Sequence, residues 1–98
     1  MNKIIAGLNK QFENRVRLGI MSGLIVNESL SFNDLKDLLG VTDGNLASHL
    51  KALEKYELIV VSKQFIGRKP NTTYYATVLG RKRFEEHLNA LEKLITRK

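Results

Sequence analysis

The sequence predicts a small, mainly helical α+β domain, and three observations support this prediction. Apolar residues recur at helical spacing from residue 10 to residue 53. A β-branched run then begins at residue 59 and is followed by the turn-forming sequence GRKPN. A second helical pattern runs from residue 78 toward the end of the chain. The expected order is therefore three helices, a two-stranded hairpin and a C-terminal helix.

The length of the chain bounds its organisation. Ninety-eight residues can bury one hydrophobic core but hardly two, so a single domain over 1–98 is expected. No N-terminal stretch approaches a signal-peptide core or the roughly 20 apolar residues of a membrane span. A cytoplasmic protein without a membrane partner is therefore expected. The absence of cysteine excludes disulfides, thiolate metal sites and a cysteine nucleophile.

The charge of the chain is positive and local. Sixteen Lys and Arg against ten Asp and Glu give a net charge of +6, which attracts polyanions. No acidic residue occurs between Leu58 and Phe84, a window that holds six cations: Lys63, Arg68, Lys69, Arg81, Lys82 and Arg83. The positive charge therefore surrounds the predicted hairpin.

Three helices are predicted before the hairpin. The first covers Lys10–Val26, where apolar residues recur at every fourth position: Phe12, Val16, Ile20 and Leu24. The second follows Ser31 or Asn33 as its N-cap and ends at Gly40, with an apolar face of Leu35, Leu38 and Leu39. The third starts at Thr42 as its N-cap and has one narrow apolar stripe: Leu46, Leu50 and Leu53. A short extended pairing at residues 30–32 is also expected.

The hairpin joins IVVSKQFI, residues 59–66, to TTYYAT, residues 72–77. Gly67 and the Pro70–Asn71 pair predict a connecting loop longer than two residues. Thr77 is the expected cap of the last helix, whose apolar positions run to the C-terminus: Val78, Leu79, Phe84, Leu88, Leu91, Leu94 and Ile95.

Two helices joined by a tight turn and followed by a basic hairpin form the order of a winged helix-turn-helix. The run from Ser31 to Leu88 carries five matching segments: LGVT, NLASHL, LEKYELI, GRKP, and YYAT followed by LGR. It resembles small bacterial and archaeal winged-helix transcriptional regulators of the MarR/ArsR-like kind. Such families place a glycine where this chain has Glu57, so we expect a differently shaped end of the third helix. The cysteines of the metal-sensing ArsR branch are absent.

The third helix, residues 42–56, is the predicted recognition helix. Its face opposite the leucine stripe is small, polar and basic: Gly44, Asn45, Ser48, Lys51, Ala52 and Lys55. A major groove accepts such a face, where Asn can contact adenine and Lys can reach guanine or phosphate. Thr42 and Asp43 stand at the helix start, where backbone N–H groups can hold a phosphate. The alternative is an ordinary solvated face, which the neighbouring tight turn and basic hairpin make less favourable.

Further candidate contacts lie beside this face and on the hairpin. His49 sits on the flank of the stripe, where packing at the core edge competes with DNA contact. The predicted wing, residues 67–72, presents Arg68 and Lys69 to phosphates or to the minor groove, with Asn71 and Thr72 as phosphate donors. An ordinary charged turn that keeps the hairpin soluble is the alternative. Arg15, Arg17 and the other basic residues are assigned to electrostatic steering.

The two ends of the chain carry apolar residues beyond what a small core needs. We expect them to form a homodimer interface: Ile4, Ile5, Leu8, Leu88, Leu91, Leu94 and Ile95. The alternative is that both ends fold back on their own domain. His87 is assigned to the surface or to this interface, and two histidines alone make no metal site. A small-molecule effector is left open, because no set of residues identifies its pocket.

The predicted function is sequence-specific binding of double-stranded DNA by a homodimeric transcriptional regulator. No phosphate-binding Gly-rich loop, nucleophile triad or carboxylate cluster predicts an enzyme, and no cofactor or metal is expected. RNA binding is disfavoured because no exposed aromatic platform is predicted, since Tyr74 and Tyr75 alternate across a strand. The operator, the regulated genes and the direction of regulation have no signature in the sequence. The alternative function is a winged-helix module for protein interaction or dimerisation without direct DNA binding.

Overall fold

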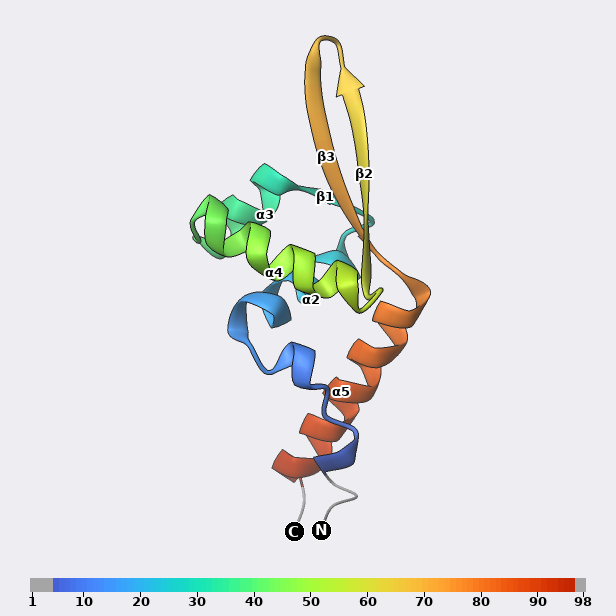
Figure 1. The fold of residues 1–98 in the computed structure, drawn as a ribbon. Coiled ribbons are helices and arrows are strands. Elements are labelled where there is room, and N and C mark those ends of the chain that lie inside the picture. The colour runs from blue at the N-terminus through green and yellow to red at the C-terminus, as the bar shows by residue number, and fades with distance from the viewer. Residues whose placement is uncertain (1–4, 97–98) are drawn as a thin grey trace.

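The computed structural model describes residues 5–96 and contains the predicted order of elements with one added 3-10 turn (Figure 1). The elements are η1 (Lys10–Phe12), α2 (Arg15–Val26), β1 (Leu30–Ser31), α3 (Phe32–Leu39), α4 (Asp43–Lys55), β2 (Ile59–Ile66), β3 (Lys69–Ala76) and α5 (Val78–Thr96). The predicted fold class, mainly helical α+β with a wing, is confirmed. β1, which pairs with β3, is the short extended segment expected before the second helix.

The predicted first helix is wrong at its start. A 3-10 turn, η1, replaces its first turn, and α2 begins only at Arg15. The Asn14 side chain accepts hydrogen bonds from the backbone N–H groups of Val16 and Arg17, and so caps a new helix instead of continuing the old one. Asparagine is a preferred N-cap because its side chain bonds to backbone donors that the helix leaves free. The apolar periodicity continues across this break, which is why spacing alone predicts one helix.

The helix-turn-helix follows the predicted caps. Ser31 forms a capping box with Asp34 at the start of α3, and Gly40 ends that helix with a left-handed φ of 63°. The Thr42 hydroxyl accepts a hydrogen bond from the Asn45 N–H at 3.2 Å and starts α4. The predicted apolar face of α3 is wrong at one position, because Leu38 is 60% exposed and covers Gly23 only with its tip.

The sheet has the strand order β1-β3-β2, and both pairs are antiparallel. The predicted long hairpin loop is wrong, because the turn holds only Gly67 and Arg68 and β3 already begins at Lys69. Gly67 supplies the positive φ, 65°, that a two-residue hairpin turn requires. β1 pairs only with the far half of β3, so Pro70 lies where β3 has a free edge and no N–H is needed.

The core lies between α2, α3, α4 and the base of the wing. Its fully buried side chains include the predicted leucine stripe of α4: Leu46, Leu50 and Leu53. α2 contributes Ile20, Met21 and Leu24. Tyr74 points inward from β3 and is buried, whereas Tyr75 on the other face is half-buried, as the alternation predicts.

The junction of α4, the wing and α5 is closely packed. Glu57 adopts the left-handed φ of 60°, the conformation that a glycine would take, so the expected difference in helix shape is wrong. Thr77 caps α5 as predicted, accepting from the Gly80 N–H at 2.8 Å and donating its hydroxyl to the Glu57 carbonyl at 2.7 Å. A Cβ at Gly80 would overlap the backbone of Leu58. The first turn of α5 is therefore locked onto the end of α4.

The molecule is elongated, with principal extents of 56 × 25 × 22 Å. The tip of the wing forms one end and the last turns of α5 form the other, with the helix-turn-helix beside the wing (Figure 1). Among the helices of residues 5–96, none combines the length and the hydropathy needed to cross a membrane.

Replacing Gly80 with Ala should destabilise the fold by about 1–3 kcal/mol, because the added methyl group must displace the Leu58 backbone. Gly44→Ala is the matched control, since Gly44 also lies in a helix and a Cβ there meets nothing within 4 Å. This control should stabilise the protein by up to about 1 kcal/mol through helix propensity. Denaturant unfolding of both variants measures the difference, and equal stabilities would contradict the packing of this junction.

Candidate nucleic-acid interface

α4 separates buried leucines from an exposed polar surface. Asn45, Ser48 and Lys51 are exposed on the side away from Leu46, Leu50 and Leu53, and so are Gly44 and Lys55. Ala52, which the spacing also assigns to this face, is half-buried. The accessible part of α4 therefore carries an amide, a hydroxyl and two cations.

A negative and a positive charge lie together at the exposed start of α4. The Asp43 carboxylate pairs with the Lys36 ammonium of α3 at 2.8 Å. Its hydrogen bond and its charge raise the pKa of Lys36 above the ordinary value of 10.5. The Thr42 hydroxyl oxygen already accepts the hydrogen bond that caps the helix. Both residues therefore have structural partners within the helix-turn-helix and remain exposed at its surface.

His49 is half-buried and has a partner that the sequence did not indicate. Its Nδ1 accepts a hydrogen bond from the Arg17 Nε at 3.0 Å, and the same guanidinium donates through Nη1 to the Gln11 Oε1 at 2.6 Å. Desolvation first, and then the Arg17 charge, lower the pKa of His49 below 6.5. Arg17 is thus fixed between η1 and α4. The predicted role in electrostatic steering does not include this structural contact. Arg17 and His49 are 32 residues apart in the sequence, so their hydrogen bond cannot be predicted from local spacing.

A cleft separates α4 from the base of the wing. Lys51 and Glu54 line it from α4, and Val61, Lys63 and Tyr74 line it from the two wing strands. The structure therefore brings Lys51 together with Lys63, which spacing alone assigned only to general steering. Burial raises the pKa of the Tyr74 hydroxyl, so this side chain stays neutral beside the two lysines.

The tip of the wing carries the predicted cations. Arg68 and Lys69 are exposed, whereas Asn71 and Thr72 are half-buried. The Asn71 side-chain amide donates to the Thr73 hydroxyl at 3.0 Å, so part of its donor capacity is used within β3. Arg68 and Lys69 are thus the more accessible members of the predicted wing set.

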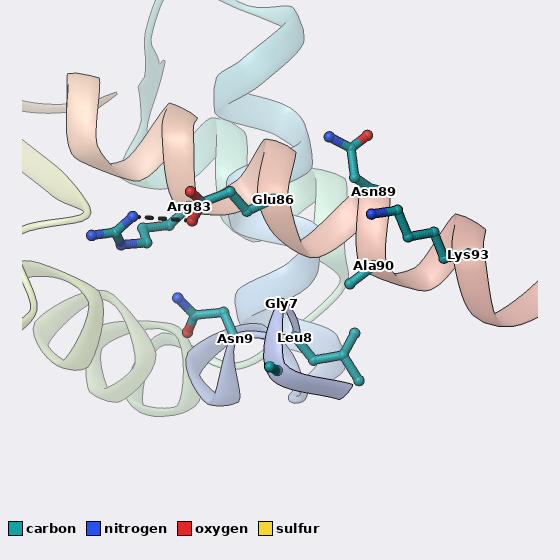
Figure 2. Close-up of a pocket in the computed structure, with 9 residues that line it drawn as sticks. Gly7, Leu8, Asn9, Arg83, Glu86, Asn89, Ala90 and Lys93 are labelled. Carbon is teal, nitrogen blue, oxygen red and sulfur yellow. Dashed lines mark hydrogen bonds and ion pairs between the residues drawn. The ribbon is translucent and has the colours of Figure 1, made fainter. Parts of the chain in front are cut away.

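The opposite end of the molecule holds the predicted dimer residues. Ile5, Leu88, Leu94 and Ile95 are between 40% and 82% exposed, and Leu8 and Leu91 are half-buried. Ile4 lies outside the described residues. Beside them, a groove of about 590 Å³ runs between residues 6–9 and α5, and Arg83, Glu86, Asn89 and Lys93 line it from the helix (Figure 2). Arg83 and Glu86 form an ion pair at 3.0 Å across one turn.

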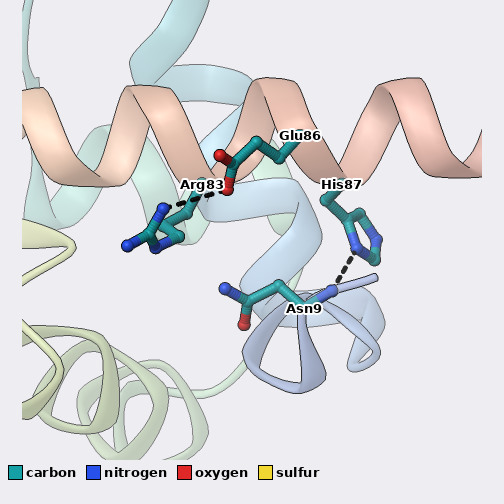
Figure 3. Close-up of polar contacts among 4 residues, drawn as sticks. All are labelled: Asn9, Arg83, Glu86 and His87. Carbon is teal, nitrogen blue, oxygen red and sulfur yellow. Dashed lines mark hydrogen bonds and ion pairs between the residues drawn. The ribbon is translucent and has the colours of Figure 1, made fainter. Parts of the chain in front are cut away.

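His87 is buried, so its assignment to the surface is wrong. Its exposed fraction is 3%, and its ring packs edge-on against Phe12 at 5.4 Å. The Asn9 backbone N–H donates to Nδ1 at 2.9 Å (Figure 3). Desolvation lowers the pKa of His87 below 6.5 against a smaller opposing effect of Glu13. His87 therefore fastens the N-terminal segment to α5, a contact across 78 residues that spacing cannot show.

No three His, Asp or Glu side chains gather as metal ligands anywhere in residues 5–96.

Comparison with known proteins gives a family and a fold. A family model described as "Winged helix DNA-binding domain" matches residues 16–95. An uncharacterized protein of Methanocaldococcus jannaschii is 35% identical over 85 residues, which cover 87% of this chain and 92% of that protein. The predicted winged-helix resemblance is thereby confirmed.

Three solved structures have similar folds. The transcriptional regulator homologue of Pyrococcus horikoshii OT3 is 30% identical with a TM-score of 0.88, covering 98% of this chain and 96% of that one. A regulator of the MarR family from Enterococcus faecalis V583 is 23% identical with a TM-score of 0.67, covering 97% and 78%. The S. aureus MepR-DNA complex is 18% identical with a TM-score of 0.76, covering 96% and 77%.

The burial of His87 generates a prediction about pH. The native state favours the neutral imidazole, so below pH 6.5 the unfolded chain binds more protons than the folded one. This contribution to stability is complete above 6.5 and is lost as the pH falls from 6.5 toward the lowered pKa. His87→Asn, which keeps an acceptor but does not titrate, should lose less stability than the wild type between pH 7 and 5. Urea unfolding at each pH measures this, and parallel losses in both proteins would contradict it, since His49 titrates in both.

Proposed function

This chain belongs to the family of winged helix DNA-binding domains, and from that premise we propose that it is a homodimeric, sequence-specific transcriptional regulator. The observation that carries the proposal is the set of exposed basic and polar side chains on α4 and the wing. Lys51 on α4 and Lys63 on β2 line the cleft between them, together with Glu54, and Arg68 lies exposed at the wing tip. A similarly folded S. aureus protein has been solved as a complex with DNA, which supports DNA as the partner.

In the proposed complex α4 lies in the major groove. Asn45 and Ser48 face the base edges, where an amide can bond adenine through its N6 and N7 atoms. Lys51 and Lys55 reach guanine or phosphate. The leucines that anchor α4 fix which residues point outward, so this reading surface is set by the core.

The DNA backbone between the two grooves would cross the cleft between α4 and the wing. Lys51 and Lys63 flank that path from opposite walls, where each can neutralise a phosphate. The wing then reaches the adjacent minor groove with Arg68 and Lys69, while Asn71 and Thr72 stand beside the backbone. Thr42 and the N–H groups at the start of α4 can hold a further phosphate, beside an Asp43 charge that Lys36 offsets.

His49 takes a different part in this proposal from the exposed residues of α4. Its Nδ1 is already bonded to Arg17, so we assign it to holding the recognition helix against α2 and η1. A base contact through the free Nε2 remains compatible with this bond. None of these roles involves a cofactor or a catalytic group.

The exposed apolar residues at the far end support a two-fold dimer. Ile5, Leu88, Leu94 and Ile95 would be covered by the same surface of a second copy, together with Leu8 and Leu91. Such a dimer presents two recognition helices to successive major grooves and fits a palindromic operator with half-sites about 34–36 Å apart. A small-molecule effector could act on this end through the groove beside α5, whose lining is largely polar.

The decisive experiment is selection of genomic duplex fragments by the purified protein over a range of salt concentrations, followed by sequencing. We expect a palindromic motif and an affinity that falls steeply with salt. A folded protein that retains no duplex even at low salt would contradict the proposal and favour the alternative, a winged-helix module for protein interaction.

Replacing Arg68 and Lys69 together with Ala should weaken binding to every duplex. The slope of log affinity against log salt should fall in magnitude by about two, because each lost phosphate contact removes close to one unit. Fluorescence anisotropy over a salt series measures both quantities. Asn45→Ala is the control on α4, and it should relax the sequence preference while leaving the slope unchanged; a uniform loss across all sequences would contradict base reading by α4.

Replacing Leu88 and Ile95 together with Glu should dissociate the dimer. The dimer dissociation constant should rise about 100-fold or more, because burying a carboxylate without a partner costs several kcal/mol. Sedimentation equilibrium measures the change. Val78→Glu is the matched control, because Val78 is 86% exposed at the opposite end of the same helix and should leave the assembly intact. A monomeric wild type at all concentrations would contradict the proposed interface.

A further inference from the structure

The tip of the wing exposes large apolar side chains as well as cations. Phe65 is 74% exposed and Ile66 is 66% exposed, at the end of the hairpin that extends beyond every other described element (Figure 1). Neither belongs to the core cluster. A charged turn that only keeps a hairpin soluble has no need of these residues, and exposed apolar strands favour aggregation.

The register places Phe65 on one definite face of the wing. Side chains alternate along a strand, so Phe65 shares its face with Lys63 and with Val61, which lines the cleft against α4. Pro70 is its partner across the hairpin. Ile66 lies on the opposite face, where its partner is Lys69. The face that leads from α4 to the tip therefore ends in an aromatic residue with a proline opposite it in the register.

We propose that Phe65 is a wedge that inserts between base pairs from the minor groove and kinks the DNA at the wing. This inference rests on the proposed function, because it concerns the same protein–DNA surface. Two observations favour DNA as the occupant of the tip. The ring lies on the same strand face as Lys63, which lines the cleft opposite Lys51. It also lies at the same hairpin tip as Arg68 and Lys69, in a stretch from residue 58 to residue 84 without any acidic side chain.

The chemistry of the tip fits this role. Proteins that bind the minor groove often insert an apolar side chain such as Phe, Ile or Pro between base steps, which unstacks the step and bends the duplex toward the major groove. Arg68 and Lys69 at the same tip can bind the DNA backbone near the unstacked step. Pyrimidine–purine steps unstack most easily, so the wedge would select such a step at a fixed distance from the sequence read by α4. The tip would then contribute to specificity without hydrogen bonds to bases.

The test uses the full chain and short duplexes recovered by the genomic selection. Energy transfer between dyes on the two duplex ends measures the bend, permanganate reactivity of thymines reports unstacked steps, and anisotropy gives the affinity. The variants are Phe65→Ala, Phe65→Leu, which keeps an apolar wedge, and Ile66→Ala, the matched control on the other face. Both substituted positions are exposed, and unaltered thermal unfolding verifies that each of the three variants folds.

We expect the wild type to bend its site by about 20–90° and to expose one reactive step. Phe65→Ala should remove both signals and weaken binding about tenfold. Phe65→Leu should restore them in large part, and Ile66→Ala should retain them.

Two results would overturn the wedge while leaving DNA binding intact: a straight wild-type complex, or an equal bend in Phe65→Ala. A variant that changes only self-association in sedimentation, or only binding to anionic lipid vesicles, would also overturn it and assign the tip to a second copy or to a lipid surface. A wild type that binds no duplex contradicts the proposed function itself, so the two failures are distinguishable.

Discussion

The burial of three leucines on α4 is the constraint on which the rest of the surface depends. Leu46, Leu50 and Leu53 are almost completely inaccessible, so α4 has one rotation about its axis that keeps them in the core. A helix turned by one residue would expose a leucine at a cost of roughly 1.5–3 kcal/mol and bury a polar group in its place. The same three contacts therefore decide that Asn45, Ser48 and Lys51 point outward. Packing, rather than any bond on the exposed side, sets the reading face.

The direction of the wing is set by the residues that follow the end of α4. Glu57 turns the chain with a positive φ, and Thr77 and Gly80 then hold the start of α5 against Glu57 and Leu58. Both strands of the wing thus leave and return to one rigid point. A non-glycine residue at φ 60° stores about 1–2 kcal/mol of strain, which the surrounding hydrogen bonds must offset. The separation between the α4 face and the wing tip is therefore a property of this junction.

Most features with local signals can be predicted from the sequence, whereas features that depend on distant partners cannot. The caps at Ser31, Thr42 and Thr77 and the alternation of Tyr74 and Tyr75 need only neighbouring residues, and the structure confirms them. The break at Asn14 was missed because apolar spacing continues across it. Pro70 suggested a loop, although a strand with a free edge tolerates proline. For Phe65 the sequence predicts only membership of a strand, because its exposure depends on how far the wing extends from the rest of the fold.

The two histidines show most clearly why such contacts escape prediction. Each accepts a hydrogen bond through Nδ1, His87 from the Asn9 backbone and His49 from the Arg17 guanidinium, so each must be neutral at that nitrogen. The two donors, Asn9 and Arg17, lie at the two ends of one short segment, residues 9–17. Gln11, within this segment, accepts a further hydrogen bond from the Arg17 guanidinium. That segment therefore connects α5, which carries the exposed apolar residues, to α4, which carries the polar face. Protonating either ring would replace an acceptor with a second donor and break its link. The arrangement of α4 and α5 thus depends on polar contacts as well as on the apolar core.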